Sequence, residues 1–384
     1  MIRPALAAFL AALAAAPAFA VSQDVDRKIA EGLAAGYAFD FEASSAAFSE
    51  VDRLEPDNPA GPFFLASLTW FEFTLNLDAP GADGELGPRF DAFIDEALRR
   101  ARVLRGKDDN DAQASFFLGA AYGMRGRWKI TKRQWVRAAS DGWKAYKELK
   151  RAVALDPACY DAYLGLGMYD YYSDTLPSVL KIASKLIVRG DKKRGLRYIE
   201  AAAANGRYSA IEARLFLAGI YNLYEKAPEK ALEVVGELRQ DHPDNLFFLY
   251  MEASARIRAR DWTGAVALGE RLAARGREVS FTAPYVSLFD RALAEAYLGG
   301  RDYPNALRAA QACVLRAPEP ESWNVTYCRL RRAQALDLLG RRGDAVEDYA
   351  AVRRRPDYWD SRRKARRGLA GPATEAIVLE ELLE

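Results

Sequence analysis

The chain has 384 residues, half of them apolar, so it can bury a sizeable core and is not disordered as a whole. Its 55 basic and 53 acidic residues nearly cancel, a balance that argues against a dedicated nucleic-acid-binding protein. Valine and isoleucine are sparse while alanine, leucine and arginine are abundant, which favours helices.

The first 20 residues have the features of an export signal. Arg3 precedes an apolar run from Ala5 to Ala15, and the tripeptide that ends at Ala20 is an A-x-A cleavage site. We therefore expect cleavage after Ala20 and a periplasmic or secreted protein. The alternative is a retained membrane anchor, although the run is shorter than the roughly 20 residues that a spanning helix needs. No cysteine follows the cut, which argues against a bacterial lipoprotein.

Small residues placed 12 positions apart, followed by a proline, recur along the chain. The first unit spans residues 21–60, where Gly32 and Ser44 take the small positions, with Phe48 and Pro56 behind them. Four regular units follow later, at 209–357. Their small pairs are Gly219 with Ala231, Ala253 with Ala265, Ala294 with Ala306, and Ala333 with Ala345. Such spacing predicts antiparallel helix pairs, because two helices approach closest where both carry glycine or alanine.

Between these two regions, residues 61–208 contain three longer units. The small partner of Gly119 is Ala145, 26 positions later instead of 12, and that of Gly167 is Gly195, 28 positions later. We expect an extra helix inserted in each of the second, third and fourth pairs. In the fourth, residues 173–175 would cap the extra helix and Pro177 would lie in its first turn. The insert is amphipathic, with Lys181, Lys185 and Arg189 opposite its apolar face.

The small pairs, the terminal prolines and the aromatics Tyr122 and Tyr297, three positions after a small residue, resemble the tetratricopeptide repeat (TPR). The lengthened central units resemble an exported bacterial type of TPR protein, with a more distant similarity to inclusion-body-clearance TPR proteins. The resemblance implies an all-α, right-handed superhelical solenoid of about eight helix pairs. Residues 358–384 would form a capping helix and a tail, because solenoids must cover their last apolar face.

The resemblance also implies a peptide-binding groove lined by the first helix of each pair. Carried over position by position, its candidates are Phe116, Met124, Leu164, Met168, Tyr171, Tyr172, Phe216, Ile220, Tyr224, Phe247, Tyr250, Arg258, Arg291, Glu295, Tyr327 and Gln334. Such a groove, aromatic in the middle and charged toward the C-terminus, suits an extended or helical peptide. The alternative is that many of these aromatics pack against the inserts or neighbouring units.

The sequence gives little support for catalysis, and we expect no catalytic residues, cofactor or metal. His242 is the only histidine and lies in a turn, and neither a C-x-x-C nor a phosphate-binding G-x-x-x-x-G-K motif is present. Glu380 and Glu381 are adjacent carboxylates, but we place them in a solvated tail. An enzyme acting on envelope glycans through a carboxylate pair remains a third alternative.

Two basic segments leave further alternatives open. Residues 127–143 combine Trp128, Trp135 and Trp143 with five cations, and residues 353–367 hold eight cations and two aspartates. Either segment could contact anionic lipid. For the first segment the alternative is plain helix packing by the tryptophans, and for the second a solvated cap helix.

Three cysteines are too few for a disulfide framework, and each is expected to be a small buried residue. One pairing is nevertheless worth testing, because Cys313 and Cys328 fall on helices expected to be neighbours. We hypothesise that they form a disulfide in an oxidising compartment.

These observations favour a non-catalytic protein-interaction scaffold of the bacterial cell envelope, with a protein or peptide partner of unknown identity and no nucleic acid. The alternative function is a membrane-peripheral protein that contacts anionic lipid through its amphipathic inserts and basic C-terminus.

Overall fold

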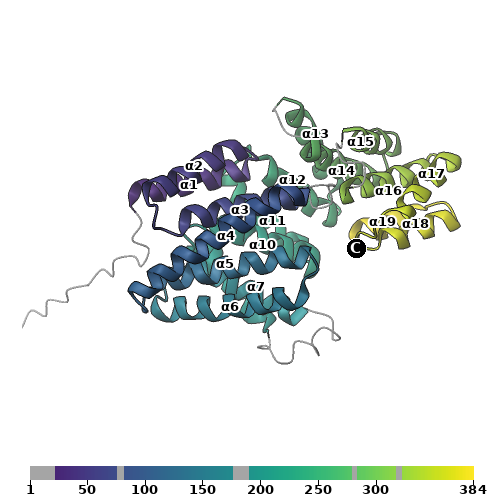
Figure 1. Cartoon of the computed structure of the whole chain (residues 1–384). Helices are drawn as coiled ribbons and strands as arrows, with labels where there is room; N and C mark the ends of the chain where they lie inside the picture. The colour runs from purple at the N-terminus through teal and green to yellow at the C-terminus, as the bar shows by residue number, and fades with distance from the viewer. Residues whose placement is uncertain (1–21, 76–81, 176–189, 279–282, 317–321) are drawn as a thin grey trace, which may run out of the picture.

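The computed structural model describes residues 22–75, 82–175, 190–278, 283–316 and 322–384. Every regular element in these ranges is a helix, and consecutive helices pair along the chain (Figure 1). The eight pairs are α1 (Gln23–Tyr37) with α2 (Phe41–Leu54), α3 (Ala60–Leu75) with α4 (Ala82–Lys107), α5 (Ala112–Thr131) with α6 (Trp135–Leu155), α7 (Tyr160–Thr175) with α9 (Lys192–Asn205), α10 (Ala210–Gly219) with α11 (Pro228–Asp241), α12 (Leu246–Arg258) with α13 (Trp262–Glu278), α14 (Ala283–Gly299) with α15 (Tyr303–Arg316), and α16 (Trp323–Leu338) with α17 (Arg342–Arg354). The predicted all-helical repeat fold is confirmed.

Local sequence signals account for where these helices begin and end. The side chains of Asp40, Asp111, Asp191 and Asn245 accept hydrogen bonds from backbone amides at the starts of α2, α5, α9 and α12, as N-cap residues do. The second helices α2, α6, α11 and α17 each end two residues before a proline, which cannot continue a helix.

Small residues lie where the paired helices cross. A Cβ atom on Gly119 would lie 2.9 Å from the backbone nitrogen of Leu149, and one on Gly167 would lie 2.7 Å from the carbonyl oxygen of Gly195. Only glycine fits so close to a backbone atom. In the last three pairs the predicted alanines are all buried: Ala253, Ala265, Ala294, Ala306, Ala333 and Ala345. The packing predicted from the 12-residue spacing is therefore present in these pairs.

The fifth pair departs from this pattern. A Cβ on Gly219 would meet no atom within 4 Å, although its predicted partner Ala231 is fully buried. Helix α10 ends at Gly219 and continues as a π-helical turn, Ile220–Tyr224, which holds one extra residue per turn. The neighbouring Ala218 is buried instead. The expected close contact of Gly219 is therefore wrong.

The central pairs are longer because their helices are longer. In the third pair, α5 and α6 run for 20 and 21 residues and are joined directly by a short turn at 132–134, so the expected inserted helix is absent there. In the second pair the extra residues extend α4 to 26 residues. Helix α7 continues through Thr175, so residues 173–175 are helical and do not cap a new helix. The extra helix expected over 176–190 lies outside the described residues, apart from Gly190.

Two further helices follow the eighth pair. Helix α18 (Ser361–Ala370) covers α17 and α16, as the predicted capping helix should. Helix α19 (Glu375–Leu383) lies in the region expected to be a tail, and it packs on α14 and α12. In Figure 1 the helices from α13 to α19, in green and yellow, extend to one side of the stack formed by the first pairs, with α12 between the two regions.

Candidate functional site

Many of the predicted groove residues belong to the core. Seven of them are at most 7% exposed and line no open surface: Phe116, Met124, Leu164, Tyr171, Ile220, Tyr327 and Gln334. For these seven the expected place in an open groove is wrong, because the side chains pack between helices, Gln334 against Glu381 of α19. The partly buried candidates are Met168, Tyr172, Phe216, Phe247, Tyr250, Arg258, Arg291 and Glu295. Tyr224 is 55% exposed.

In the N-terminal half, aromatic side chains close the inner side of the solenoid. Phe39 lies in the turn after α1, and its ring centroid is 6.0 Å from that of Phe71 on α3 and 5.6 Å from that of Phe247 on α12. Phe41 also contacts Phe71, at 5.8 Å. We call these four rings the aromatic seam. The seam joins the first two pairs to the sixth, so Phe247 faces other parts of the chain instead of an open groove.

Polar contacts reinforce this closure between distant pairs. The Tyr208 hydroxyl donates to Asp26 on α1 over 2.8 Å, and the Arg207 guanidinium lies 2.8 Å from the same carboxylate. Arg127 on α5 reaches Glu212 on α10 over 3.1 Å. Burial and the hydrogen bond to Asp26 raise the pKa of Tyr208, so the phenol stays a donor at neutral pH. The first six pairs therefore form a closed turn held by their own side chains.

The tyrosines at the end of α7 serve the same closure. Tyr171 is fully buried, and its hydroxyl donates to Glu225, which also lies 2.8 Å from the ammonium of Lys192. Tyr172 and Tyr224 meet with their ring centroids 5.8 Å apart. Burial raises the pKa of Tyr172 to about 12, so this ring is neutral. These residues join α7 to the π-helical turn after α10.

In the C-terminal half the first helices α12, α14 and α16 present a different surface. Arg331 donates through Nε to Glu295 Oε1 over 3.0 Å, and Arg291 reaches the same oxygen over 3.3 Å. Arg291 also donates to the Tyr250 hydroxyl over 2.9 Å. Burial by itself raises the pKa of Glu295, but Arg291, Arg331 and Arg258 together hold it below its usual value. We call Arg258, Arg291 and Arg331, with Glu295 between them, the arginine face.

Helix α19 lies on the arginine face. Arg258 Nη1 donates to the backbone carbonyl of Leu383 over 2.9 Å, and Arg331 Nη2 donates to that of Glu381 over 3.3 Å. The Gln334 side-chain amide donates to Glu381 Oε2 over 2.6 Å. Glu381 is only 3% exposed, so its expected place in a solvated tail is wrong. Burial raises the pKa of Glu381 despite the nearby cations.

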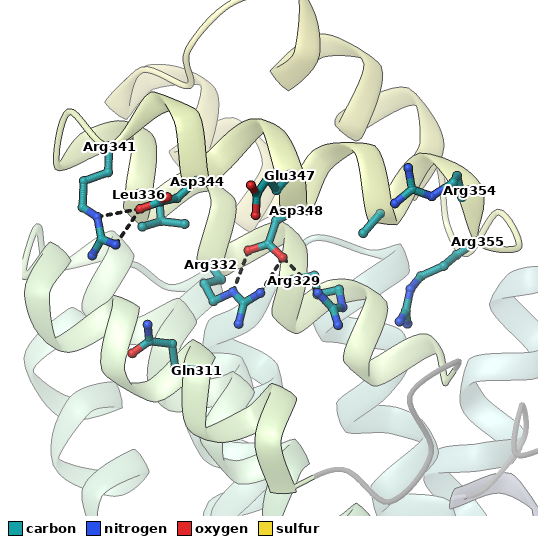
Figure 2. A pocket seen from close by; sticks show the side chains of 11 residues that line it. Gln311, Arg329, Arg332, Leu336, Arg341, Asp344, Glu347, Asp348, Arg354 and Arg355 are labelled. Carbon is teal, nitrogen blue, oxygen red and sulfur yellow. Dashed lines mark hydrogen bonds and ion pairs between the residues drawn. The ribbon is translucent and has the colours of Figure 1, made fainter.

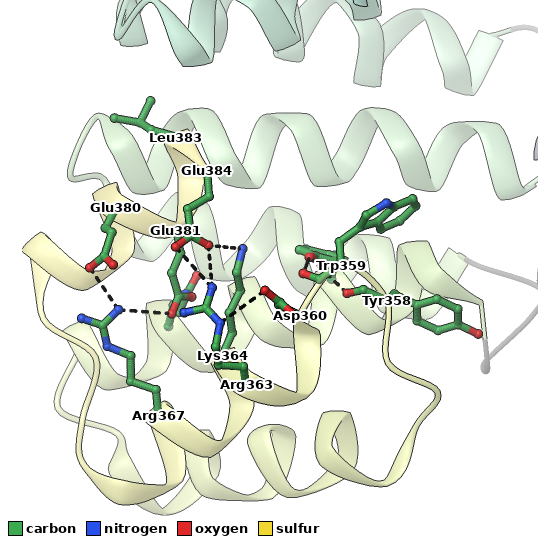
Figure 3. A network of polar contacts seen from close by, with 12 residues as sticks. Tyr358, Trp359, Asp360, Arg363, Lys364, Arg367, Glu380, Glu381, Leu383 and Glu384 are labelled. Carbon is green, nitrogen blue, oxygen red and sulfur yellow. Dashed lines mark hydrogen bonds and ion pairs between the residues drawn. The ribbon is translucent and has the colours of Figure 1, made fainter. Parts of the chain in front are cut away.

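The basic segment at 353–367 is largely committed to the same region. Figure 3 shows Lys364 and Arg363 of α18 directed at Glu384, each at 3.1 Å, and Arg367 reaching Glu380 at 3.0 Å. Lys364 is 6% exposed and also lies over the Tyr327 ring. Several of these cations therefore hold α19 in place, which the sequence alone did not indicate.

A polar hollow of about 670 Å³ opens over α16 and α17 (Figure 2). Its lining is Gln311, Arg329, Arg332, Leu336, Arg341, Asp344, Glu347, Asp348, Ala351, Arg354 and Arg355. The buried carboxylate of Asp348 accepts from Arg329 over 3.1 Å and from Arg332 over 2.6 Å. These ion pairs join α16 to α17, so much of the polar lining of the hollow serves to hold the two helices together.

The tryptophans of segment 127–143 divide between core and surface. Trp128 is buried and stacks on Phe90, with ring centroids 4.3 Å apart. Trp143 is 37% exposed and stacks on Tyr146 of the same helix, with ring centroids 6.0 Å apart. Trp135 is 61% exposed and the adjacent Val136 is 85% exposed. Packing between helices therefore explains Trp128 and neither of the other two rings.

The cysteines lie on the elements expected from the sequence. Cys313 of α15 and Cys328 of α16 form a disulfide, with their Cα atoms 6.0 Å apart. Asn324 and Ser287 border the Cys313 sulfur. Cys159 is buried, and burial raises the pKa of its thiol to about 12, which makes it unreactive.

No group of three or more histidine, cysteine or carboxylate side chains among the described residues is placed to hold a metal ion. Within the same residues, none of the helices combines the length and the apolar character that crossing a bilayer requires.

Comparisons with known proteins add little. No protein-family model matches the sequence, and no curated protein matches it. Among solved structures, yeast Tom70 matches with a TM-score of 0.47 and 12% identity, over 94% of this chain and 90% of that chain. A Rap protein complexed with competence and sporulation factor matches with a TM-score of 0.47 and 15% identity, over 94% and 100%. The P58(IPK) TPR domain matches with a TM-score of 0.27 and 16% identity, over 93% and 99%.

All three TM-scores lie below 0.5, so the fold conclusion rests on the helices of this chain. The antiparallel pairs, the small residues at their crossings and the prolines behind their second helices together are the architecture of a TPR-like solenoid.

Proposed function

We propose that the chain is a non-catalytic scaffold that binds a segment of another protein on the arginine face of α12, α14 and α16. The observation that carries this proposal is the hydrogen bond from Arg258 to a backbone carbonyl at the end of a helix. The residues of this face already recognise polypeptide, by its carbonyl oxygens and by its carboxylates.

The chemistry of the arginine face suits a peptide ligand. Guanidinium groups donate several hydrogen bonds in a fixed plane, and here packing and ion pairs hold two of them in place. The Arg331 guanidinium lies over the Tyr327 ring at 5.7 Å, and the Arg291 guanidinium lies over the Trp323 ring at 5.1 Å, so an aromatic ring supports each cation. Cations bordered by rings are a combination enriched at protein interfaces.

We further propose that the protein works outside the cytoplasm, in the periplasm or beyond the cell. The support is the export signal in residues 1–20, together with the pairing of Cys313 and Cys328. Sequencing the N-terminus of the protein purified from an envelope fraction tests this. A start at Val21 is expected, and an intact Met1 in a cytoplasmic fraction would contradict it.

The scaffold function is tested by crosslinking in the native envelope, followed by mass spectrometry of the captured partners. The Arg258→Glu variant should lose the partner, because a carboxylate cannot donate to a carbonyl oxygen. Arg258→Lys should retain part of the capture. Arg353→Glu is the matched control, because Arg353 is exposed on α17, a helix that packs on α16 and α18. Equal recovery of partners by Arg258→Glu and Arg353→Glu would refute the proposed site.

A second function, peripheral contact with anionic lipid, has one observation in its favour. Trp135 and Val136 are exposed beside the exposed cations Arg133 and Arg137 at the turn between α5 and α6. Flotation with anionic liposomes tests it directly. If the protein floats with the liposomes and the double variant Trp135→Ser with Val136→Ser does not, lipid contact is favoured. If the protein does not float, lipid contact is refuted and the scaffold function is the one that stands.

A further inference from the structure

Helix α19 does not continue the repeat pattern. A ninth unit would pair α19 with α18, on the outer side of the solenoid. Instead α19 returns across the first helices of earlier pairs, packing on α14 and α12. Its contacts reach Arg258 on α12 and Arg331 and Gln334 on α16, and α18 flanks it from the other side (Figure 3). The helix therefore occupies the position that a bound peptide would take.

In the polar contacts between α19 and its surroundings, one side supplies the acceptors and the other the donors. Helix α19 and Glu384 supply the acceptors: two backbone carbonyls and the carboxylates of four glutamates. The surroundings supply the donors, which are Arg258, Arg301, Tyr303, Arg331, Gln334, Arg363, Lys364 and Arg367. Residues 375–384 contain four glutamates and no lysine or arginine. Cations facing the C-terminal end of a helix also interact favourably with its dipole.

Two apolar side chains anchor the helix. Val378 is 1% exposed and Leu382 is 5% exposed, and they lie four residues apart on one face of α19. Glu381 lies on that same buried face. The bound motif is therefore an apolar residue, then a glutamate three positions on and a second apolar residue directly after it.

Two terms in the free energy of docking α19 are unfavourable. The Glu381 carboxylate is buried with one neutral donor, Gln334, and the guanidinium of Arg367 is 3.9 Å away. Burial without a close charged partner disfavours the ionised carboxylate. A nine-residue helix is also too short to be stable by itself in water. Docking of α19 is thus opposed by two terms, and a partner segment that lies within a longer helix need not carry the second of them.

We infer, building on the proposed function of this face, that α19 is a built-in occupant of the partner site. The partner is a protein segment of the same chemistry: an acidic, amphipathic helix with apolar residues four positions apart and a glutamate before the second. Such a segment displaces α19 and takes over its contacts with Arg258, Arg331 and Gln334. The chain therefore carries a competitor for its own ligand. The apparent affinity for a partner is the intrinsic affinity multiplied by the fraction of molecules in which α19 is not docked.

The probe for this inference is a fluorescent peptide of residues 374–384, titrated against the full-length mature protein. Val378→Ser with Leu382→Ser releases the internal helix, and the double variant should bind the peptide about tenfold or more tightly than the wild type. Ala376→Ser is the matched control, because Ala376 is on the exposed face of α19. Adding Arg258→Glu to the double variant should abolish binding, and so should a peptide with Glu381→Lys.

A second measurement does not depend on the double variant folding. Hydrogen–deuterium exchange of the wild type with excess peptide should show faster exchange of the α19 amides and protection of α12 and α16. The Glu381→Lys peptide should leave both unchanged. If excess peptide neither binds nor accelerates exchange in α19, then α19 is a fixed structural cap and the inference is overturned. Peptide binding without any partner in the envelope experiment would instead refute only the cellular scaffold function.

Discussion

The two halves of the solenoid use their inner faces in opposite ways. In the first six pairs, rings such as Phe39, Phe71 and Phe247 meet across the interior and close it. From α12 onward the first helices also carry arginines that are partly or fully buried, and a short acidic helix lies on them. Rings that meet in the interior gain free energy by leaving water, so separating them is costly, whereas hydrogen-bonded cations can exchange one acceptor for another. The comparison teaches that the inner face of one repeat fold can be a core in one region and a binding surface in the next.

The largest expected effect comes from breaking the aromatic seam. Phe39→Ala should lower the free energy of unfolding by about 4 kcal/mol, because an 8% exposed ring that contacts three others is removed. Chemical denaturation measures the loss, and exchange of the α1 and α12 amides locates it in the N-terminal half. Trp135→Ala is the control, since that ring is 61% exposed. A similar loss in both variants would mean that the seam does not hold the two regions together.

A somewhat smaller effect is expected from the helix crossing in the fourth pair. A Cβ on Gly195 would lie 2.6 Å from the Tyr171 nitrogen and 2.8 Å from the Gly167 carbonyl oxygen, and neither backbone atom can move aside alone. Gly195→Val should therefore cost about 3 kcal/mol in thermal or chemical denaturation. Gly236→Ala is the matched helical control, because a Cβ there meets nothing within 4 Å and should stabilise the protein slightly. Tolerance of valine at Gly195 would show that this pair is not closely packed.

The C-terminal half should respond to reduction. Cys313 and Cys328 close a loop of 15 residues, for which chain entropy gives at most about 3 kcal/mol of stabilisation. Reduction, or Cys328→Ser, should shift unfolding of α14–α17 to lower denaturant and leave the aromatic seam intact. A thiol titration of the denatured, unreduced protein should find one free thiol, that of Cys159. Finding three would exclude the disulfide.

The smallest effect concerns Glu381. In the folded protein its pKa is raised above the ordinary 4.5 by burial, so the folded state holds the proton more tightly than the unfolded chain does. The benefit of protonation is complete below about pH 4.5 and is lost as the pH rises through the folded pKa. Arg331, Lys364 and Arg367 face this carboxyl and moderate the rise of its pKa, whereas the nearby carboxylate of Glu384 adds to it.

Mild acidification from neutral pH should therefore tighten the docking of α19, until the ion pairs of Glu384, whose pKa is lowered, begin to protonate below pH 4.5. Glu381→Gln mimics the neutral form and should change the free energy of unfolding by less than about 1 kcal/mol while removing most of this pH dependence. Comparing peptide affinity at two pH values in both proteins measures it. An unchanged pH response in Glu381→Gln would assign the effect to other groups.

The sequence by itself determined the repeat. Glycine and alanine at 12-residue spacing and prolines after the second helices are local signals, and they sufficed for the helix pairs and for the neighbouring positions of Cys313 and Cys328. One local signal was missed. Val378 and Leu382 are four residues apart, a spacing that is typical of an amphipathic helix, yet their segment was expected to be a tail.

Only the tertiary structure decided what faces the interior of the solenoid. Phe39 and Phe247 are far apart in the chain, and their contact depends on how much each helix pair rotates relative to the last, a sum of small angles that no local pattern contains. The same is true of Arg258 and Leu383. The lengthening of α5 and α6, in place of an inserted helix, was likewise decided by packing, because Trp128 gains a buried position on Phe90 only if α5 continues past the usual turn.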